Sequence, residues 1–131
     1  MDPRTGFVVS LVVTLVFLGS VVLNGFRARR RAHVTSVVLA VLSLLVTIYF
    51  AEQLGAMYDV KGTGWIYDTH MVLVYIATPA FLLPIATGLW TTKHPGARRV
   101  HRAMAILVLG LTVVAAATGA LMMYSAERIP V

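Results

Sequence analysis

Four long, uncharged apolar stretches dominate the chain and decide what it can fold into. They contain 20, 18, 20 and 22 residues and run from Phe7 to Phe26, Val34 to Ala51, Met71 to Trp90 and Ala103 to Tyr124. An α-helix needs roughly 17–25 apolar residues to cross a bilayer whose hydrocarbon core is about 30 Å thick. The pattern therefore predicts four transmembrane helices. With 131 residues in total, of which 12% are charged, little chain remains for a soluble catalytic domain.

The charges predict how these helices are oriented. Eight of the eleven Lys and Arg residues fall in two connections that contain no acid: Arg27, Arg29, Arg30 and Arg31 in the first, and Lys93, Arg98, Arg99 and Arg102 in the third. All five acids lie in the second connection or near the two ends of the sequence. The positive-inside rule then puts the basic connections in the cytoplasm and both termini outside. The same asymmetry explains the net charge of +6 without a nucleic-acid partner.

These patterns predict an all-α fold: one domain over residues 1–131, an integral membrane antiparallel four-helix bundle with N-out/C-out topology, and helices over about 7–26, 33–54, 67–91 and 99–124. The first connection is so short that the first two helices should pack side by side. Small residues suit close packing on the first helix, at Gly6, Ser10, Gly19, Ser20 and Gly25. Pro79 and Pro84 should kink the third helix. We expect no internal repeat and no linker.

Histidines are the main candidates for cofactor chemistry, because the chain contains no cysteine. Without cysteine there can be no thiolate metal site, no iron–sulfur cluster on thiolates and no C-x-x-C-H haem attachment. His33, His94 and His101 should lie near the cytoplasmic side, and His70 near the outer side. The 24 positions from His70 to His94 would span about 36 Å of helix, so a single metal ion cannot bind both.

At the inner side, His33 and His101 could ligate opposite faces of one haem b iron or another metal ion, since imidazole suits iron, copper and zinc. Nearby basic side chains could bind the haem propionates; the candidates are Arg30, Arg98 and Arg102. His94 is either a third ligand or a loop residue. The alternative is that these histidines are simply interfacial residues at helix boundaries.

At the outer side, Glu52 closes the second helix while Asp68 and His70 open the third. A carboxylate and an imidazole at similar depth could handle protons or bind a metal ion, with His70 as the metal ligand. Glu52 could equally be a solvated residue at a helix end. Copper is also possible, although the methionines form no repeated M-x-x-M array and suit ordinary core packing. No motif of a hydrolase or transferase occurs, and we expect a non-enzymatic protein.

Several short segments occur in a characteristic order: R-R-A-H at 30–33, T-H-M-V-L at 69–73, V-H-R-A-M-A at 100–105 and A-T-G-A-L-M-M-Y at 117–124. Together they resemble the YozB/CtaM-type family of small four-helix bacterial membrane proteins, over roughly residues 27–124. The resemblance implies a role in the maturation of haem–copper terminal oxidases, and it matches His33, His70 and His101. The K-H-P-G-A-R-R connection around His94, and Glu52, depart from the family pattern.

Three functions follow as hypotheses. The first is a membrane accessory protein that handles haem or metal during assembly of a respiratory haem–copper oxidase. It would reside in the bacterial inner (cytoplasmic) membrane, in contact with the lipid bilayer and with other membrane proteins of that assembly. The second is a b-type haem electron-transfer or quinone-reactive subunit of a larger redox complex. The third is a purely structural accessory subunit.

Overall fold

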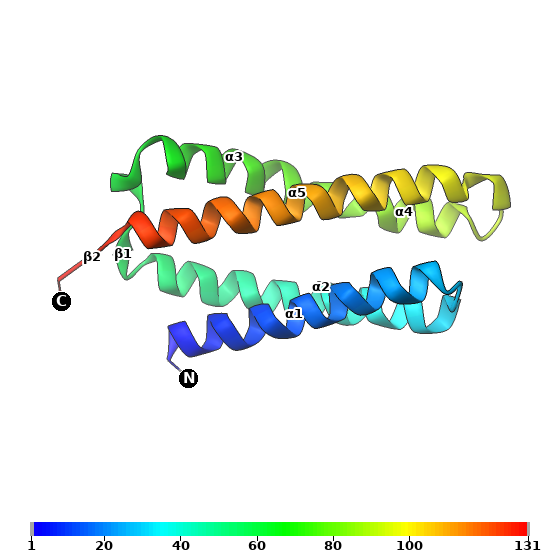
Figure 1. Ribbon diagram of the computed structural model, residues 1–131, viewed down its shortest axis with the longest axis horizontal. Coiled ribbons are helices and arrows are strands. Elements are labelled where there is room, and N and C mark those ends of the chain that lie inside the picture. Colours follow the sequence, from blue (N-terminus) through cyan, green and yellow to red (C-terminus); the bar gives the residue numbers. More distant parts are fainter. Residues whose placement is uncertain (1, 131) are drawn as a thin grey trace. The chain divides into compact units, whose positions relative to one another are not determined.

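The computed structural model describes residues 2–130, and these form two compact units that divide after Tyr58 (Figure 1). Four helical segments are long and apolar enough to cross a membrane: Pro3–Phe26, Arg30–Gly55, Trp65–Trp90 and Pro95–Ser125. The predictions of an all-α chain and of four membrane-length helices are confirmed. Outside the helices lie two strands of two residues each, β1 (Tyr58–Asp59) and β2 (Glu127–Arg128).

The first unit is a helical hairpin of α1 (Pro3–Phe26) and α2 (Arg30–Gly55). Asp2 begins α1 as its N-cap, because its carboxylate accepts a hydrogen bond from the Thr5 backbone N–H at 3.2 Å. Pro3 occupies the first helical position, where a missing N–H costs nothing. The predicted side-by-side packing of the first two helices is confirmed.

A tight turn joins these two helices. Ala28 has a φ of 54°, in the left-handed region that ends many helices but that a side chain with a Cβ disfavours. This conformation lets the Arg29 N–H donate to the Asn24 carbonyl at 3.0 Å. Helix α2 can therefore begin at Arg30, only four residues after α1 ends at Phe26.

Small and polar side chains form the interface between α1 and α2. The hydroxyls of Thr14 and Thr47, both buried, lie 3.0 Å apart, and those of Ser20 and Ser36 lie 2.8 Å apart. At the other end of α1, a Cβ added to Gly6 would lie 2.4 Å from the Phe50 ring, so this position has no room for a larger residue. Four of the five small residues predicted to allow close packing, Gly6, Ser10, Ser20 and Gly25, face α2 or are buried. Gly19 has nothing within 4 Å of its would-be Cβ.

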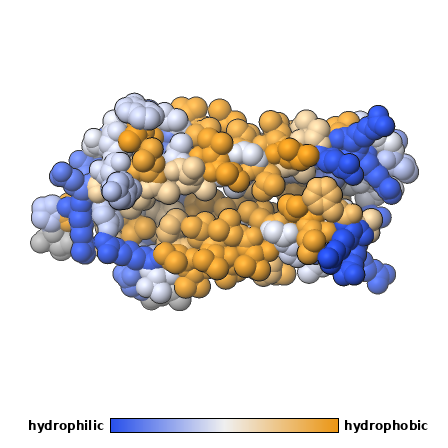
Figure 2. Space-filling model, viewed as in Figure 1, coloured by the Kyte–Doolittle hydropathy of each residue, from blue (hydrophilic) through white to orange (hydrophobic). Residues whose placement is uncertain are grey.

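Large apolar side chains point outward from the helices instead of filling a core. Val16, Leu45 and Leu89 are 63%, 58% and 67% exposed, whereas the buried positions are mostly alanine, serine and threonine. Figure 2 shows hydrophobic surface along the helices and hydrophilic surface at their ends. Interfaces of small residues beneath an apolar exterior are typical of helices surrounded by lipid.

The second unit contains α3 (Trp65–Ala80), α4 (Leu82–Trp90) and α5 (Arg98–Ser125), with short 3₁₀ turns η1 (Lys61–Thr63) and η2 (Pro95–Ala97). Both α3 and α4 pack against α5. Gly64 precedes α3 with a φ of 61°, which glycine adopts without strain.

The third span, expected as one kinked helix over 67–91, is interrupted at Phe81. Pro79 and Pro84 lack the N–H groups that would complete the helical ladder around this residue. The Phe81 N–H instead donates to the Thr78 carbonyl at 3.3 Å, three residues back. The prolines therefore divide the span into α3 and α4.

Three predicted features depend on how the two units are placed relative to each other and to a membrane. They are the antiparallel bundle, the N-out/C-out orientation and the single domain over residues 1–131. These three features stay predictions.

Candidate cofactor ligands

His33 is the fourth residue of α2, and its imidazole packs against α1. Its Nδ1 lies 2.9 Å from the Val21 carbonyl oxygen. The ring also lies close to Gly25 of α1, where an added Cβ would be 3.3 Å from His33 Nδ1. Because Gly25 has no side chain, the imidazole of His33 fits against α1 at this position.

His101, the fourth residue of α5, repeats this arrangement against α4. Its Nδ1 lies 3.2 Å from the Thr87 hydroxyl oxygen. The Thr87 hydroxyl lies 2.7 Å from the Leu83 carbonyl and donates its proton there. A Cβ added at Gly88 would lie 3.2 Å from His101 Cε1.

His70 has the same type of environment between α3 and α5. Its Nδ1 lies 3.1 Å from the Ala115 carbonyl oxygen and 3.1 Å from the Thr118 hydroxyl oxygen. Gly119 adjoins the ring so closely that an added Cβ would come within 2.8 Å of Cε1.

These contacts determine the tautomer of all three rings. A carbonyl oxygen can only accept a hydrogen bond, so the Nδ1 atoms of His33 and His70 must carry the proton. The Thr87 hydroxyl uses its single proton on Leu83, so its oxygen accepts from His101 Nδ1 as well. In each neutral ring the lone pair is then on Nε2. An imidazole with Nδ1–H held by a protein oxygen and a lone pair on Nε2 is the form that metal-ligating histidines adopt. The chemistry of these donors fits a haem or transition-metal ion.

His33 and His101 belong to a short duplicated motif. Helix α2 begins with Arg30-Arg31-Ala32-His33, and α5 begins with Arg98-Arg99-Val100-His101. In both cases the histidine faces a glycine near the end of the preceding helix. This pattern of four residues is too short to count as an internal repeat, so the expectation that the chain has none stays a prediction. The signal Arg-Arg-x-His was visible in the sequence, whereas the glycine and oxygen partners were not.

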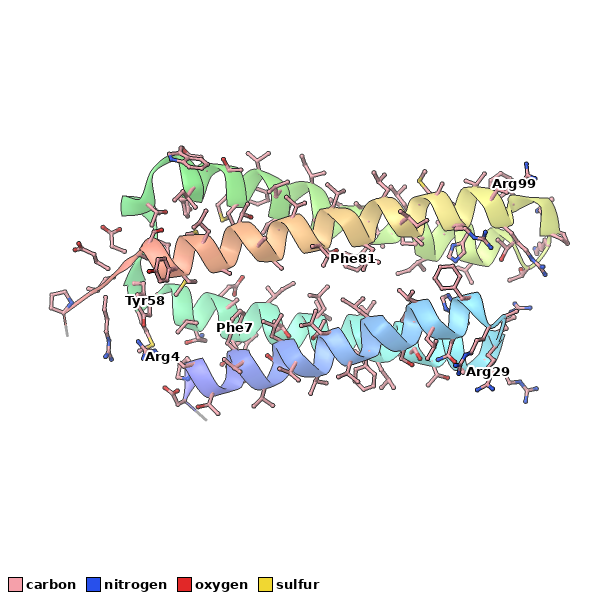
Figure 3. The ribbon with its side chains drawn as sticks, in the orientation of Figure 1. Arg4, Phe7, Arg29, Tyr58, Phe81 and Arg99 are labelled. Atoms are coloured by element: carbon pink, nitrogen blue, oxygen red, sulfur yellow. The ribbon has the colours of Figure 1, made fainter. Side chains whose placement is uncertain are left out.

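The other candidates near the two basic connections are exposed. Arg30, Arg98 and Arg102 lie in the first two turns of α2 or α5 with their side chains exposed. His94 is also exposed, and its ring lies edge-on to Trp90 with the ring centroids 5.8 Å apart. Figure 3 shows Arg29 and Arg99, which mark these basic ends of the first and second units.

The structure separates His70 from His101. His70 contacts Thr118 on α5, and Thr118 is 17 positions after His101, which corresponds to about 25 Å along the helix. His70 and His101 therefore cannot share a metal ion within this unit. Residues 2–130 contain no group of three or more His, Asp and Glu side chains arranged to hold a metal ion. His33 and His101 belong to different units, and their pairing at one ion stays a prediction.

Next to the second connection, Glu52 and Asp68 are both exposed, whereas His70 is half-buried against α5. Glu52 and His70 lie in different units. Their association stays a prediction.

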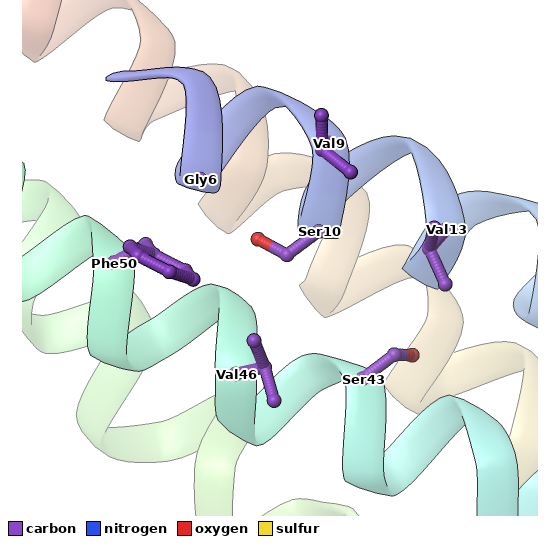
Figure 4. A pocket seen from close by; sticks show the side chains of 7 residues that line it. All are labelled: Gly6, Val9, Ser10, Val13, Ser43, Val46 and Phe50. Carbon is purple, nitrogen blue, oxygen red and sulfur yellow. The ribbon is translucent and has the colours of Figure 1, made fainter. Parts of the chain in front are cut away.

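An apolar groove also opens between α1 and α2 within the first unit (Figure 4). It has a volume of about 250 Å³ and is lined by Gly6, Val9, Ser10, Val13, Ser43, Val46 and Phe50. Its two hydroxyls already contact backbone carbonyls of their own helices, at 3.1 Å from Ser10 to Phe7 and 3.0 Å from Ser43 to Ala40. The groove therefore presents no titratable or ligating group.

No protein-family model, curated protein or solved structure matches the chain.

Proposed function

We propose that this chain is a multi-pass membrane protein that handles haem, with His33 and His101 as ligands of one haem iron. The observation that carries the proposal is the duplicated Arg-Arg-x-His motif. In both copies Nδ1 of the histidine lies within hydrogen-bond distance of an oxygen on the preceding helix, as in many metal-ligating histidines.

The charges next to these histidines support haem over a bare metal ion. Haem carries two propionates, and arginine binds carboxylates through charge-assisted hydrogen bonds. Arg30 and Arg98 precede the two histidines by three residues, and Arg102 follows His101. With two imidazoles as axial ligands, haem would supply electron-transfer or carrier chemistry, and the chain would contribute binding and orientation.

The resemblance to the YozB/CtaM-type family favours an accessory role in maturation of a bacterial haem–copper oxidase, without enzymatic activity of its own. In this proposal the two units associate as an antiparallel bundle in the inner membrane, with both basic ends in the cytoplasm. The bundle would bring the two duplicated motifs to the same membrane side.

The proposed topology is testable because the chain contains no natural cysteine. In intact cells, a membrane-impermeant thiol reagent should label Pro3→Cys and Glu127→Cys, and it should leave Arg29→Cys unlabelled. Labelling of Arg29→Cys from outside, or protection of both terminal cysteines until the cells are lysed, would exclude the orientation.

Haem titration of the purified full-length protein tests the ligand pair. We expect a Soret band and the α/β bands of a six-coordinate, bis-imidazole haem. His33→Ala and His101→Ala should each abolish this six-coordinate spectrum. His94→Ala is the matched control at the same side and should keep it, as should His70→Ala.

Two results would contradict the proposal: absence of haem binding, or wild-type spectra in both the His33→Ala and His101→Ala proteins. A copper signal without a Soret band would favour the metal alternative. A stoichiometric haem that is reversibly reduced but never passed to an acceptor protein would favour the electron-transfer alternative.

A further inference from the structure

A second feature at the start of α2 points to a lipid. Arg30, Arg31, Val34 and Thr35 line an open groove of about 530 Å³ on the first unit. Their positions in the sequence, i, i+1, i+4 and i+5, put them on one face of the helix. His33 faces α1 at Gly25, so the groove is separate from the candidate haem ligand.

The charge at this end of the hairpin is uncompensated within the first unit. Between Asp2 and Glu52 the sequence contains no acid, whereas the turn carries Arg27, Arg29, Arg30 and Arg31. Because α1 and α2 are antiparallel, Asp2 and Glu52 both lie at the opposite end. The 22 residues from Arg30 to Glu52 correspond to about 33 Å of helix, several times the Debye length of about 8 Å at physiological ionic strength.

The groove combines this charge with an apolar wall. Val34 is 52% exposed, and Val38, one turn further along α2, is also 52% exposed. A phosphodiester could therefore bind the two guanidinium groups while an acyl chain follows the valines along the helix. A free inorganic anion would use only the polar part of this surface.

We propose that this groove binds the headgroup phosphate of an anionic phospholipid, with one acyl chain along Val34 and Val38. Arg30 is also a candidate partner of the haem propionates, but Arg31 is not, so a test at Arg31 in the absence of haem does not depend on the proposed haem site. A phosphatidylglycerol-type lipid is the simplest ligand of this chemistry.

The test measures binding of dioctanoyl phosphatidylglycerol to the full-length protein in a neutral detergent, without haem, by native mass spectrometry. Arg31→Gln should weaken the apparent affinity about fivefold, since an interfacial arginine contributes about 1 kcal/mol to anionic-lipid binding. Arg29→Gln is the matched control: it removes the same charge two residues away, outside the groove, and should change the affinity less than twofold. Circular dichroism of both variants should show the helical content of the parent protein.

Three outcomes would overturn the proposal. The first is equal weakening by the two substitutions, which would indicate a general charge effect. The second is equally tight binding of dioctanoyl phosphatidylcholine, which has no net charge. The third is displacement of the lipid by inorganic phosphate at the same concentration, which would identify a site for free anions.

Discussion

Gly119 leaves the space that His70 occupies, and replacing it with alanine tests how tightly this histidine is held. In Gly119→Ala the new Cβ would lie 2.8 Å from Cε1, 3.3 Å from Nδ1 and 3.4 Å from Nε2 of the His70 ring. The ring would have to move, and its hydrogen bonds to Ala115 and Thr118 would lengthen or break.

The expected cost is the sum of three effects. Overpacking costs about 1–3 kcal/mol, and a lost hydrogen bond between membrane helices costs about 0.6 kcal/mol on average. Alanine in a helix interior offsets this by about 0.5–1 kcal/mol relative to glycine. We therefore expect Gly119→Ala to lower the free energy of unfolding by about 1–3 kcal/mol.

Gly110→Ala is the matched control on the same helix, because nothing lies within 4 Å of a Cβ at Gly110. It should be neutral or stabilising by up to about 1 kcal/mol. Reversible unfolding in mixed detergent, followed by circular dichroism, measures both variants.

A double-mutant cycle with His70→Ala then isolates the contact. Removing the ring should relieve the clash, so His70→Ala/Gly119→Ala should be more stable than the two single effects predict, by about 1 kcal/mol or more. Equal stability of Gly119→Ala and Gly110→Ala, or an additive cycle, would refute the packing described for His70.

Three further predictions concern the first unit. Ala28→Gly should raise the free energy of unfolding by about 0.5–1 kcal/mol, since the φ of 54° disfavours alanine; an unchanged or lower unfolding midpoint would contradict the turn geometry. Thr14→Val keeps the shape of the side chain but removes its hydrogen bond to Thr47, and a loss of about 0.5–1.5 kcal/mol is expected in the same assay. Tyr58→Phe removes the acceptor of the Arg4 hydrogen bond but keeps the ring beneath the guanidinium, 5.6 Å from the ring centroid (Figure 3). Because this contact is exposed, the loss should stay below about 1 kcal/mol, and a larger value would mean that the tyrosine hydroxyl has another role.

Local sequence was enough to predict some details of the fold. The start of α1 was not among them: the predicted helix begins at residue 7, whereas Asp2 and Pro3 begin it as an acceptor cap followed by a residue without an N–H. The short basic connection after Phe26 leaves the next helix no path except back along α1. Pro79 and Pro84 predicted a kink in the third span. They did not predict that the helix would be interrupted at Phe81, between the two residues that lack a backbone N–H.

The candidate ligands could be predicted from the sequence only in part. His33, His70 and His101 were identifiable by residue type and by position near helix ends. Their hydrogen-bond partners were not, because these depend on which residue of the neighbouring helix lies opposite. His70 and Gly119 are 49 positions apart in the sequence, and no local pattern connects them.

Bilayer thickness sets the length of an uncharged stretch, so the sequence by itself determined the number of apolar helices, although their ends run on into charged residues such as Arg30 and Arg98. It also determined that any metal bound by side chains would depend mainly on imidazole, since thiolates are absent. Only the tertiary structure decided which glycine lies against each imidazole and which oxygen accepts from Nδ1. Those features depend on the register between neighbouring helices within each unit. Side chains that are far apart in the sequence set this register by packing against one another.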